Sequence, residues 1–291
     1  MNIGVVLQTN AGGFDCQDLA DALLSLGDNV DVGLFKFEHA GFGKRFSWDN
    51  LSQTGITGVM GSISFVRQTK DWFEGGDLAP FFNSNLHYCH KYIHQIPLEA
   101  RLNAKAVMLP RQDIKAWGFE ALATLMASGG SLPNKLFFRP DQALKVCEAE
   151  LVEAACFDQW VQYLELHTGT SDSSLFWVAP EQSIKKEYRC LISQGVVKSI
   201  SSYGFEQEPE NVDATPIFLA IQQFLGPILL GLTEMDPAYV LDVAELDSGE
   251  LRVIELNCLS TSGLYKLNLH EVANALVDGL RLLHREWYDV D

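Results

Sequence analysis

The stretch Tyr239–Asn257, YVLDVAELDSGELRVIELN, contains two apolar, β-like runs joined by a turn. The turn is Asp247–Glu250, with Ser-Gly at the point where the chain reverses, which is typical of a hairpin. The first run carries Asp242, and the second ends in Glu255 and Asn257. Alternation along a strand places Glu255 and Asn257 on one face. We therefore expect an antiparallel hairpin in which Asp242 lies near that face.

The polar side chains of this hairpin predict a metal site. Asp242, Glu255 and Asn257 offer two carboxylates and an amide oxygen, and such hard oxygen ligands suit Mg²⁺ that also binds waters and phosphate oxygens. A carboxylate inside an apolar strand needs a partner or a metal. Arg252 is the one basic residue of the hairpin, and since it precedes Glu255 by three positions we expect it on the opposite face.

The composition excludes several classes of protein. The chain has 291 residues, which suits two or three subdomains, and 47% of them are hydrophobic, so that a sizeable core can form. The net charge of −17 argues against binding to nucleic acid or to an anionic membrane through a basic face. It does not exclude ATP, because Mg²⁺ and a few local cations suffice to bind phosphates.

Three further features indicate a cytoplasmic protein. The opening Met1–Leu7 has no basic segment of the kind that signal peptides contain. No apolar run is long enough to cross a bilayer. The six cysteines include no CxxC pair, and we expect them to be reduced cytosolic thiols.

The order of the apolar runs predicts an α/β start followed by an α+β region. Asn2–Gln8 and Val30–Phe37 are strand-like and flank a helix-like segment, Asp15–Leu26, which together give a βαβ unit. Further along, Gln194-Gly195 is a turn pair between two strands. The other expected elements are a strand pair or a strand and turn at Ile56–Val66, strands at Ala104–Leu109, Lys135–Asp141, Leu175–Ala179, Lys186–Ser193 and Val196–Tyr203, and helices at Phe119–Ala127, Val146–Leu166, Pro216–Leu230 (interrupted at Gly226-Pro227) and His270–Trp287.

Cationic side chains occur near the strands that precede the hairpin. Arg139 ends one strand and Lys145 follows it, while Glu187 and Arg189 share one face of a later strand. Between them, the apolar strand Leu175–Ala179 stops at a proline, where backbone groups could meet the edge of an adenine. Phosphoryl transfer needs cations on the phosphates, Mg²⁺ bridging oxygens and exclusion of water. These residues and the hairpin together supply each of these requirements.

The ordered set of motifs resembles the ATP-grasp superfamily over about residues 100–291. It is similar in particular to the phage- and bacteria-associated members that carry arginine where most ATP-grasp enzymes place their first nucleotide-binding lysine. The motifs are FFRPD (Phe137–Asp141) with Lys145, KEYRCLI (Lys186–Ile192), SSYG (Ser201–Gly204), VLDVAE (Val240–Glu245) and VIELNCLSTSGLY (Val253–Tyr265).

The resemblance implies an α+β fold in which two subdomains clasp a nucleotide, preceded by a small α/β N-terminal domain. We place the N-terminal domain at residues 1–100, the first subdomain at 101–180 and the second, with the metal hairpin, at 181–291. The N-terminal domain and the loop Ser260–Tyr265 would help to form the acceptor site.

The resemblance also implies roles for individual residues. Asp242, Glu255 and Asn257 would hold Mg²⁺, for which Mn²⁺ could substitute. Arg189 would stabilise the transferred phosphoryl group or an acylphosphate. The remaining implied contacts are Arg139 and Lys145 with phosphates, Trp177, Val178 and Ala179 with adenine, and Glu187 with ribose or with Arg189.

The implied activity is that of an ATP-dependent, ADP-forming ligase. A carboxylate attacks the γ-phosphate of ATP, and an amine or thiol captures the acylphosphate. The acceptor would be an amino acid, a peptide or a protein, with no nucleic-acid or membrane partner; the sequence identifies neither the two substrates nor an oligomeric state.

Three other functions stay open at this stage. A kinase on the same scaffold would form a stable phosphoester. A nucleotide-binding protein without turnover would explain why Asp141–Ala149 lacks the glycines of a typical phosphate flap. A zinc protein would use His87, His90 and His94, which share one face if the segment is a single helix.

Overall fold

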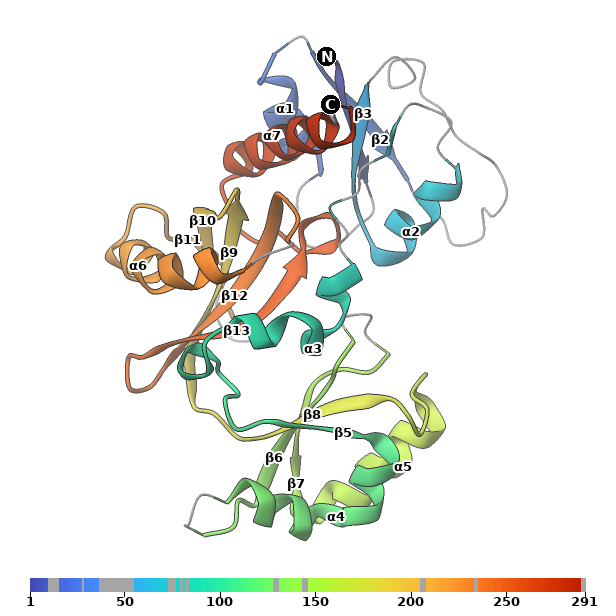
Figure 1. Cartoon of the computed structure of the whole chain (residues 1–291), viewed down its shortest axis with the longest axis vertical. Coiled ribbons are helices and arrows are strands. Elements are labelled where there is room, and N and C mark those ends of the chain that lie inside the picture. The colour runs from blue at the N-terminus through green and yellow to red at the C-terminus, as the bar shows by residue number, and fades with distance from the viewer. Residues whose placement is uncertain are drawn as a thin grey trace.

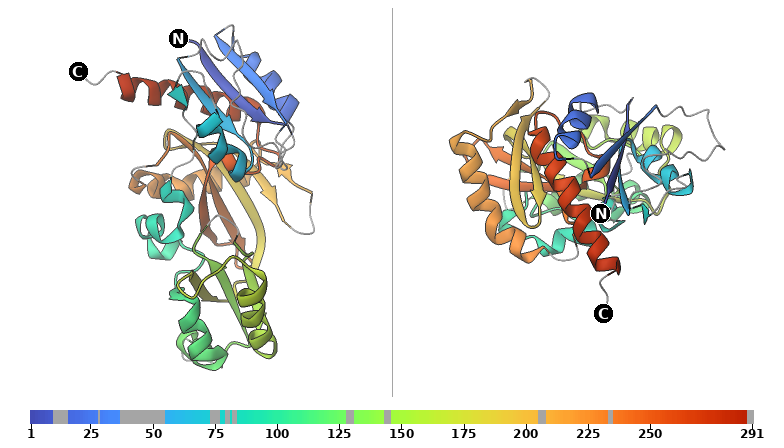
Figure 2. Two further views of the ribbon diagram at one scale, coloured as in Figure 1. Left: turned by 90° about the vertical axis from the view of Figure 1, so that its right-hand side faces the viewer. Right: turned by 90° about the horizontal axis from the view of Figure 1, so that it is seen from above.

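The computed structural model of this protein describes residues 1–9, 16–27, 29–36, 55–72, 77–78, 81, 84–127, 131–142, 146–204, 208–232 and 235–288. These residues form three sheets, which follow one another along the long axis of the molecule (Figures 1 and 2). We number the sheets in chain order; the third lies between the first and the second in Figure 1. None of the described helices is long and apolar enough to span a membrane.

The first sheet is parallel and has the strand order β2-β1-β3-β4. This arrangement confirms the predicted α/β start. The region predicted as a strand pair, or as a strand and turn, is instead a strand followed by a helix, and Ala11–Gly13 lies outside the described residues. The elements are β1 (Ile3–Gln8), α1 (Cys16–Leu24), β2 (Val30–Phe35), β3 (Ile56–Met60), α2 (Ile63–Trp72) and β4 (Asp77–Leu78).

The last helix of the chain, α7 (Leu269–Tyr288), packs on this first sheet beside α1 (Figure 1). Its apolar face, with Val272, Leu276 and Leu280, is fully buried in one cluster with residues of β1 and β3. These apolar residues recur at helical spacing, as expected for the helix that the sequence predicts over His270–Trp287. The two ends of the described chain therefore share one hydrophobic core.

The second sheet is antiparallel, with the order β5-β8-β6-β7, and carries helices α4 and α5. The prediction of one helix over Val146–Leu166 was wrong, because residues 150–153 pair with β6 as an edge strand. The predicted helix at Phe119–Ala127 begins earlier, and Gly118 (φ 72°) kinks it. The elements are β5 (Val107–Pro110), α4 (Arg111–Met126), β6 (Lys135–Pro140), β7 (Glu150–Glu153), α5 (Phe157–His167) and β8 (Leu175–Pro180).

The third sheet is antiparallel, with the order β11-β10-β9-β12-β13. Both predicted hairpins are confirmed. Gln194 and Gly195 turn the first with φ values of 50° and 72°, and Gly249 turns the second with φ 82°. The strands are β9 (Ile184–Ser193), β10 (Val196–Tyr203), β11 (Glu210–Asn211), β12 (Ala238–Leu246) and β13 (Leu251–Cys258).

A β-bulge at Ile254 sets the faces of β13. Asp242 pairs with Glu255, whereas Val243 pairs with Val253, so Ile254 is the extra residue. Arg252 consequently lies on the same face as Glu255, contrary to the prediction, because the bulge adds one residue to the alternation between them. It forms an ion pair with Glu250 at 3.0 Å.

The apolar face of the third sheet is covered by α6 (Pro216–Gly231) and by the segment around α3 (Cys89–Tyr92). The predicted interruption of α6 was wrong, since the helix runs through Pro227. Its buried residues, including Ile221 and Leu225, pack against the sheet and offset the hydrogen bond that proline cannot make. The opposite face carries Val240 and Leu191 into the core of the first sheet.

Gly279 provides a test of the packing of α7 in the core of the first sheet. A Cβ there would lie 2.8 Å from a ring atom of the fully buried Phe81. We expect Gly279→Ala to lower the free energy of unfolding by about 1–3 kcal/mol, despite the better helix propensity of alanine. Denaturant titration measures this, and Asn274→Ala on the exposed side of the same helix is the control. An equal gain in stability in both variants would contradict the packing.

Candidate functional site

One row of directly paired residues crosses the whole third sheet. It runs from Glu255 on β13 through Asp242, Arg189 and Ser201 to Asn211 on β11. Because partners in register share a face, the first three side chains lie side by side. Asp242 is fully buried and Arg189 nearly so. The antiparallel register thus brings together three charged residues that are far apart in the sequence.

Arg189 is held along one edge by Asp242. Its Nε donates to Oδ1 at 2.9 Å and its Nη2 donates to Oδ2 at 2.7 Å, a bidentate geometry that is both strong and directional. Nη1 donates to the carbonyl oxygen of Gly263 at 2.8 Å. These bonds use three of the five N–H donors of a guanidinium group. Two donors bond to no other described residue and are available to an oxyanion.

Glu255 links this pair to the second sheet. Nη2 of Arg139, on β6, donates to Oε2 of Glu255. The amide Nδ2 of Asn257 lies 2.9 Å from Glu255 Oε1 and 3.4 Å from Asp242 Oδ2. The five side chains form a continuous series in which two carboxylates flank one amide and a guanidinium group lies at each end. We call Arg139, Glu255, Asn257, Asp242 and Arg189 the charge chain.

The charge chain shifts the pKa of its members in opposite directions. Burial raises the pKa of Asp242, although the Arg189 guanidinium opposes the shift. Burial acts on Glu255 in the same sense, but Arg139, the Asn257 amide and Arg189 outweigh it and lower the Glu255 pKa below its usual value. Against the effect of burial, the paired carboxylates raise the pKa of both arginines. Both cations therefore persist throughout the physiological pH range.

The predicted metal ligands converge on one point. Oxygens of Asp242 and Glu255 both contact the same amide nitrogen of Asn257. Rotation of that amide would present its oxygen to the same place, so the set fits a small cation that takes one or two carboxylates and fills its shell with water and phosphate. In the described part of the chain no three His, Cys, Asp or Glu side chains gather into a metal-binding group. Two carboxylates and an amide are the ligands available here.

Glu187 and two tyrosines lie beside Arg189. Glu187 pairs in register with Tyr203 and hydrogen-bonds to its side chain. Burial, together with the charges of Asp242 and Glu255, raises the pKa of Glu187. The rings of Tyr203 and Tyr265 lie 5.5 and 4.9 Å from the Arg189 guanidinium carbon. Tyr203 was not predicted as a site residue, and Tyr265 was predicted only as the end of the acceptor loop Ser260–Tyr265, although both stand in the quoted motifs.

Of the three residues predicted to border adenine, one faces a cavity. Trp177 lines a cavity of about 50 Å³ between the second and third sheets, together with Arg139 and the bulged Ile254. Val178 and Ala179 are fully buried, and Val178 belongs to the core of the second sheet. The extra residue of the bulge, Ile254, therefore lines the same cavity as Trp177.

Asp141 orients Trp177 and was not predicted as a site residue. This buried carboxylate accepts hydrogen bonds from the indole Nε1 at 2.8 Å and from the backbone N–H of His90 at 2.9 Å. Its second oxygen contacts His90 Nδ1. The indication in the sequence was its place at the end of FFRPD, directly after the strand that carries Arg139.

Comparison with protein families decides the relationship. The family model that matches residues 65–278 is described as an ATP-grasp domain, family 3 of its clade. The chain belongs to this ATP-grasp family. A comparison with curated proteins finds no significant match.

Solved structures show the same ATP-grasp fold at low sequence identity. D-cycloserine synthetase DcsG matches with a TM-score of 0.66 and 11% identity, over 96% of this chain and 100% of that one. D-alanine–D-alanine ligase from Bacillus anthracis, complexed with ATP, matches with 0.58 and 12%, over 98% and 99%. A Chryseobacterium gregarium RiPP-associated ATP-grasp ligase, in complex with ADP and a leader and core peptide, matches with 0.57 and 10%, over 97% of each.

Two further sequence predictions concern Lys145 and the three histidines. Lys145 lies outside the described residues. The single helix that would align three histidines for zinc is wrong, because His87 ends one 3₁₀ turn, His90 lies in α3 and His94 lies in another 3₁₀ turn.

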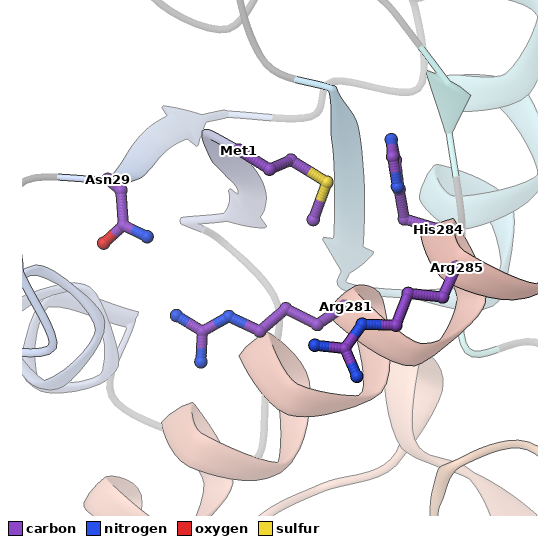
Figure 3. A pocket seen from close by; sticks show the side chains of 5 residues that line it. All are labelled: Met1, Asn29, Arg281, His284 and Arg285. Carbon is purple, nitrogen blue, oxygen red and sulfur yellow. The ribbon is translucent and has the colours of Figure 1, made fainter. Parts of the chain in front are cut away.

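A second, basic cavity lies away from the charge chain. It has a volume of about 270 Å³ and is formed by the residues that precede β1 and β2 and by the last turns of α7 (Figure 3). None of the predicted site residues that the structure describes lines it. The lining residues are Met1, Asn29, Arg281, His284 and Arg285.

The Arg189–Asp242 pair can be tested by removing its cation. We expect Arg189→Gln to lower the free energy of unfolding at pH 8 by about 3–5 kcal/mol, because a buried carboxylate loses its partner. Without the guanidinium, the folded-state pKa of Asp242 lies further above its unfolded value. The folded state then binds the proton more tightly, and the loss shrinks as pH falls through that folded pKa.

Chemical denaturation at pH 8 and pH 5.5 measures both effects. Arg281→Gln is the control, since its ion pair with Asp278 is exposed and contributes roughly 0–1 kcal/mol. A loss for Arg189→Gln that matches this control, or that grows toward low pH, would contradict the buried pair.

Proposed function

We propose that this protein is an ATP- and Mg²⁺-dependent ligase that joins a carboxylate to an amine or thiol through an acylphosphate. The observation that carries the proposal is the charge chain, in which two arginines and two carboxylates meet between the second and third sheets. MgATP brings the complementary charges, since phosphates match the arginines and the metal matches the carboxylates. The ATP-grasp family membership supports the nucleotide.

Arg139 and Arg189 are the residues that we assign to the phosphates. Arg189 is already fixed by Asp242 and Gly263 and retains two donors, which suits a γ-phosphate whose charge changes during transfer. Arg139 comes from the opposite sheet and lines the cavity beside Trp177. We assign Lys145 to the phosphates as well, by its place in the motif.

Asp242, Glu255 and Asn257 would hold Mg²⁺, and Mn²⁺ could replace it. When bound, the metal neutralises charge on the phosphate oxygens and aligns them for in-line transfer. Glu255 would then exchange Arg139 for the metal, which releases the guanidinium toward the phosphates. The solved ligase PsnB has been captured with a minimal precursor, Mg and ADP, which supports Mg²⁺ as the metal.

We place the base in the cavity between Trp177 and Ile254, beside the backbone of Val178 and Ala179. A cavity of about 50 Å³ holds only a few water molecules, so binding of a purine requires the two sheets to move apart. We assign Glu187 to the ribose or, through its hydrogen bond with Tyr203, to the orientation of the groups around Arg189.

The proposed reaction has two steps. A substrate carboxylate oxygen attacks the γ-phosphorus, a P–O bond forms, and ADP leaves with the electrons of the broken bond. The nitrogen of an amine then attacks the acyl carbon; a C–N bond forms, phosphate leaves and the amine loses a proton. The cations of the charge chain stabilise the negative charge that develops in both steps.

The acceptor would be an amino acid or a peptide. The proteins of similar fold include a D-alanine–D-alanine ligase and a RiPP-associated ligase bound to a leader and core peptide. We propose that residues 1–100 and the loop Ser260–Tyr265 form the acceptor site, with subdomains at 101–180 and 181–291 around the nucleotide. A binding protein without turnover is the second candidate, favoured by the glycine-free segment Asp141–Ala149.

Product analysis separates these functions. We expect the purified protein with ATP, Mg²⁺ and a panel of amino acids and peptides to release ADP and phosphate in equal amounts, and Asn257→Ala to abolish turnover while nucleotide still binds. A kinase would release ADP without phosphate and leave a stable phosphoester. Absence of any ATP- or ADP-dependent thermal shift with Mg²⁺ would contradict nucleotide binding altogether.

Removal of Arg139 tests the exchange of partners on Glu255. We expect Arg139→Gln to bind Mn²⁺ alone more tightly, by about tenfold or 1.4 kcal/mol, because Glu255 no longer has a competing cation. The same variant should bind MgATP more weakly. Titration of Mn²⁺ followed by electron paramagnetic resonance measures the first effect, with Lys198→Gln, an exposed lysine on β10, as the control. Weaker binding of both ligands would contradict the exchange.

A further inference from the structure

Two tyrosines from different elements form an aromatic pair over Arg189. Tyr203 ends β10, and Tyr265 lies in the loop between the 3₁₀ turn Leu259–Thr261 and α7. Their rings are parallel within 4° with centroids 4.8 Å apart. The guanidinium carbon of Arg189 lies 4.9 Å from one centroid and 5.5 Å from the other, so both rings are within cation–π distance.

The backbone of Tyr265 is held in an unfavourable conformation. Its φ of 49° lies in the left-handed region, which a bulky residue other than glycine rarely adopts and which persists where the surroundings impose it. The surroundings do so here. The N–H of Lys266 donates to Ser201 Oγ at 3.1 Å, and its carbonyl accepts from Asn211 Nδ2 at 3.1 Å.

The other side of the loop is attached to the arginine itself. Gly263 accepts a hydrogen bond from Arg189 Nη1, so the residues on both sides of Leu264-Tyr265 are fixed to the sheet that carries the charge chain. Ordinary core packing does not explain the strain, because the Tyr265 side chain is 38% exposed. Tyr203 is tied to the site through its hydrogen bond with Glu187.

We propose that Tyr203 and Tyr265 are positioning residues that hold the Arg189 guanidinium against movement out of the plane it shares with Asp242. The bidentate bonds fix one edge of the group, and the bond from Nη1 to Gly263 holds its third nitrogen. The two rings lie within cation–π distance of the group and restrict its remaining movement out of this plane. The two remaining N–H donors then point in one direction, toward the oxyanion.

This inference rests on the proposed function in one respect, namely that the oxyanion is the γ-phosphate. It follows that the tyrosines contribute to the preference for a nucleotide with three phosphates over one with two. Tyr265 is the better residue to change, since Tyr203 also bonds to Glu187 and its loss would alter two contacts.

The first experiment uses the nucleotide-free protein. In a spectrum of ¹⁵N-arginine side chains, the Arg189 Nε–Hε signal, assigned by its loss in Arg189→Lys, should exchange with water about tenfold faster in Tyr265→Leu than in the parent, since the group then tilts freely. Tyr265→Phe keeps the ring and should restore the parent rate. An unchanged rate in Tyr265→Leu would overturn the proposal whether or not the protein binds nucleotide.

The second experiment measures affinity for ADP and for a non-hydrolysable ATP analogue with Mg²⁺ by calorimetry. We expect Tyr265→Leu to weaken binding of the analogue by about tenfold relative to ADP, whereas Tyr265→Phe and the distant, exposed Tyr163→Leu keep the parent ratio. An unchanged ratio in a protein that binds both nucleotides would overturn the γ-phosphate role alone. Failure of the parent to bind either nucleotide would overturn the proposed function instead, and with it the γ-phosphate role. Melting temperatures of all variants report whether they are folded.

Discussion

Asp242 is a carboxylate that is fully buried within a strand. Its charge must therefore be balanced by a neighbouring group. Arg189 meets this requirement from the neighbouring strand β9, and Asn257 adds an amide contact from β13. Each of these partners has a further partner of its own, which extends the network to Glu255, Gly263 and the tyrosine pair. The geometry of the whole site therefore depends on the register of three antiparallel strands around one charge.

Much of this could be predicted from patterns with a fixed period. The hairpin 239–257, the face shared by Glu255 and Asn257, and the placement of Glu187 and Arg189 on one strand face follow from alternation and turn chemistry. The predictions that failed all depended on a contact with another element. A bulge, such as that at Ile254, is visible only against the partner strand. The strand β7 exists because β6 lies beside it, and α6 continues through Pro227 because its face is buried.

The second and third sheets are joined across the site by specific polar contacts. Arg139 reaches Glu255 from β6, and Asp141 at the end of the same strand holds both Trp177 and the backbone of His90. Charged groups of both signs are therefore already in place where the sheets meet. A ligand that replaced one of these contacts would change how the second and third sheets are attached to each other.

The packing of α7 on the first sheet also has a consequence for synthesis of the chain. Val272, Leu276 and Leu280 share a core with Ile3 and Val5, so β1 is synthesised long before the helix that covers its apolar side. The core of the second sheet comes from one continuous stretch, residues 107–178, so this sheet needs no such distant segment and can fold earlier. The first sheet is then exposed to chaperones and to aggregation until α7 has been synthesised.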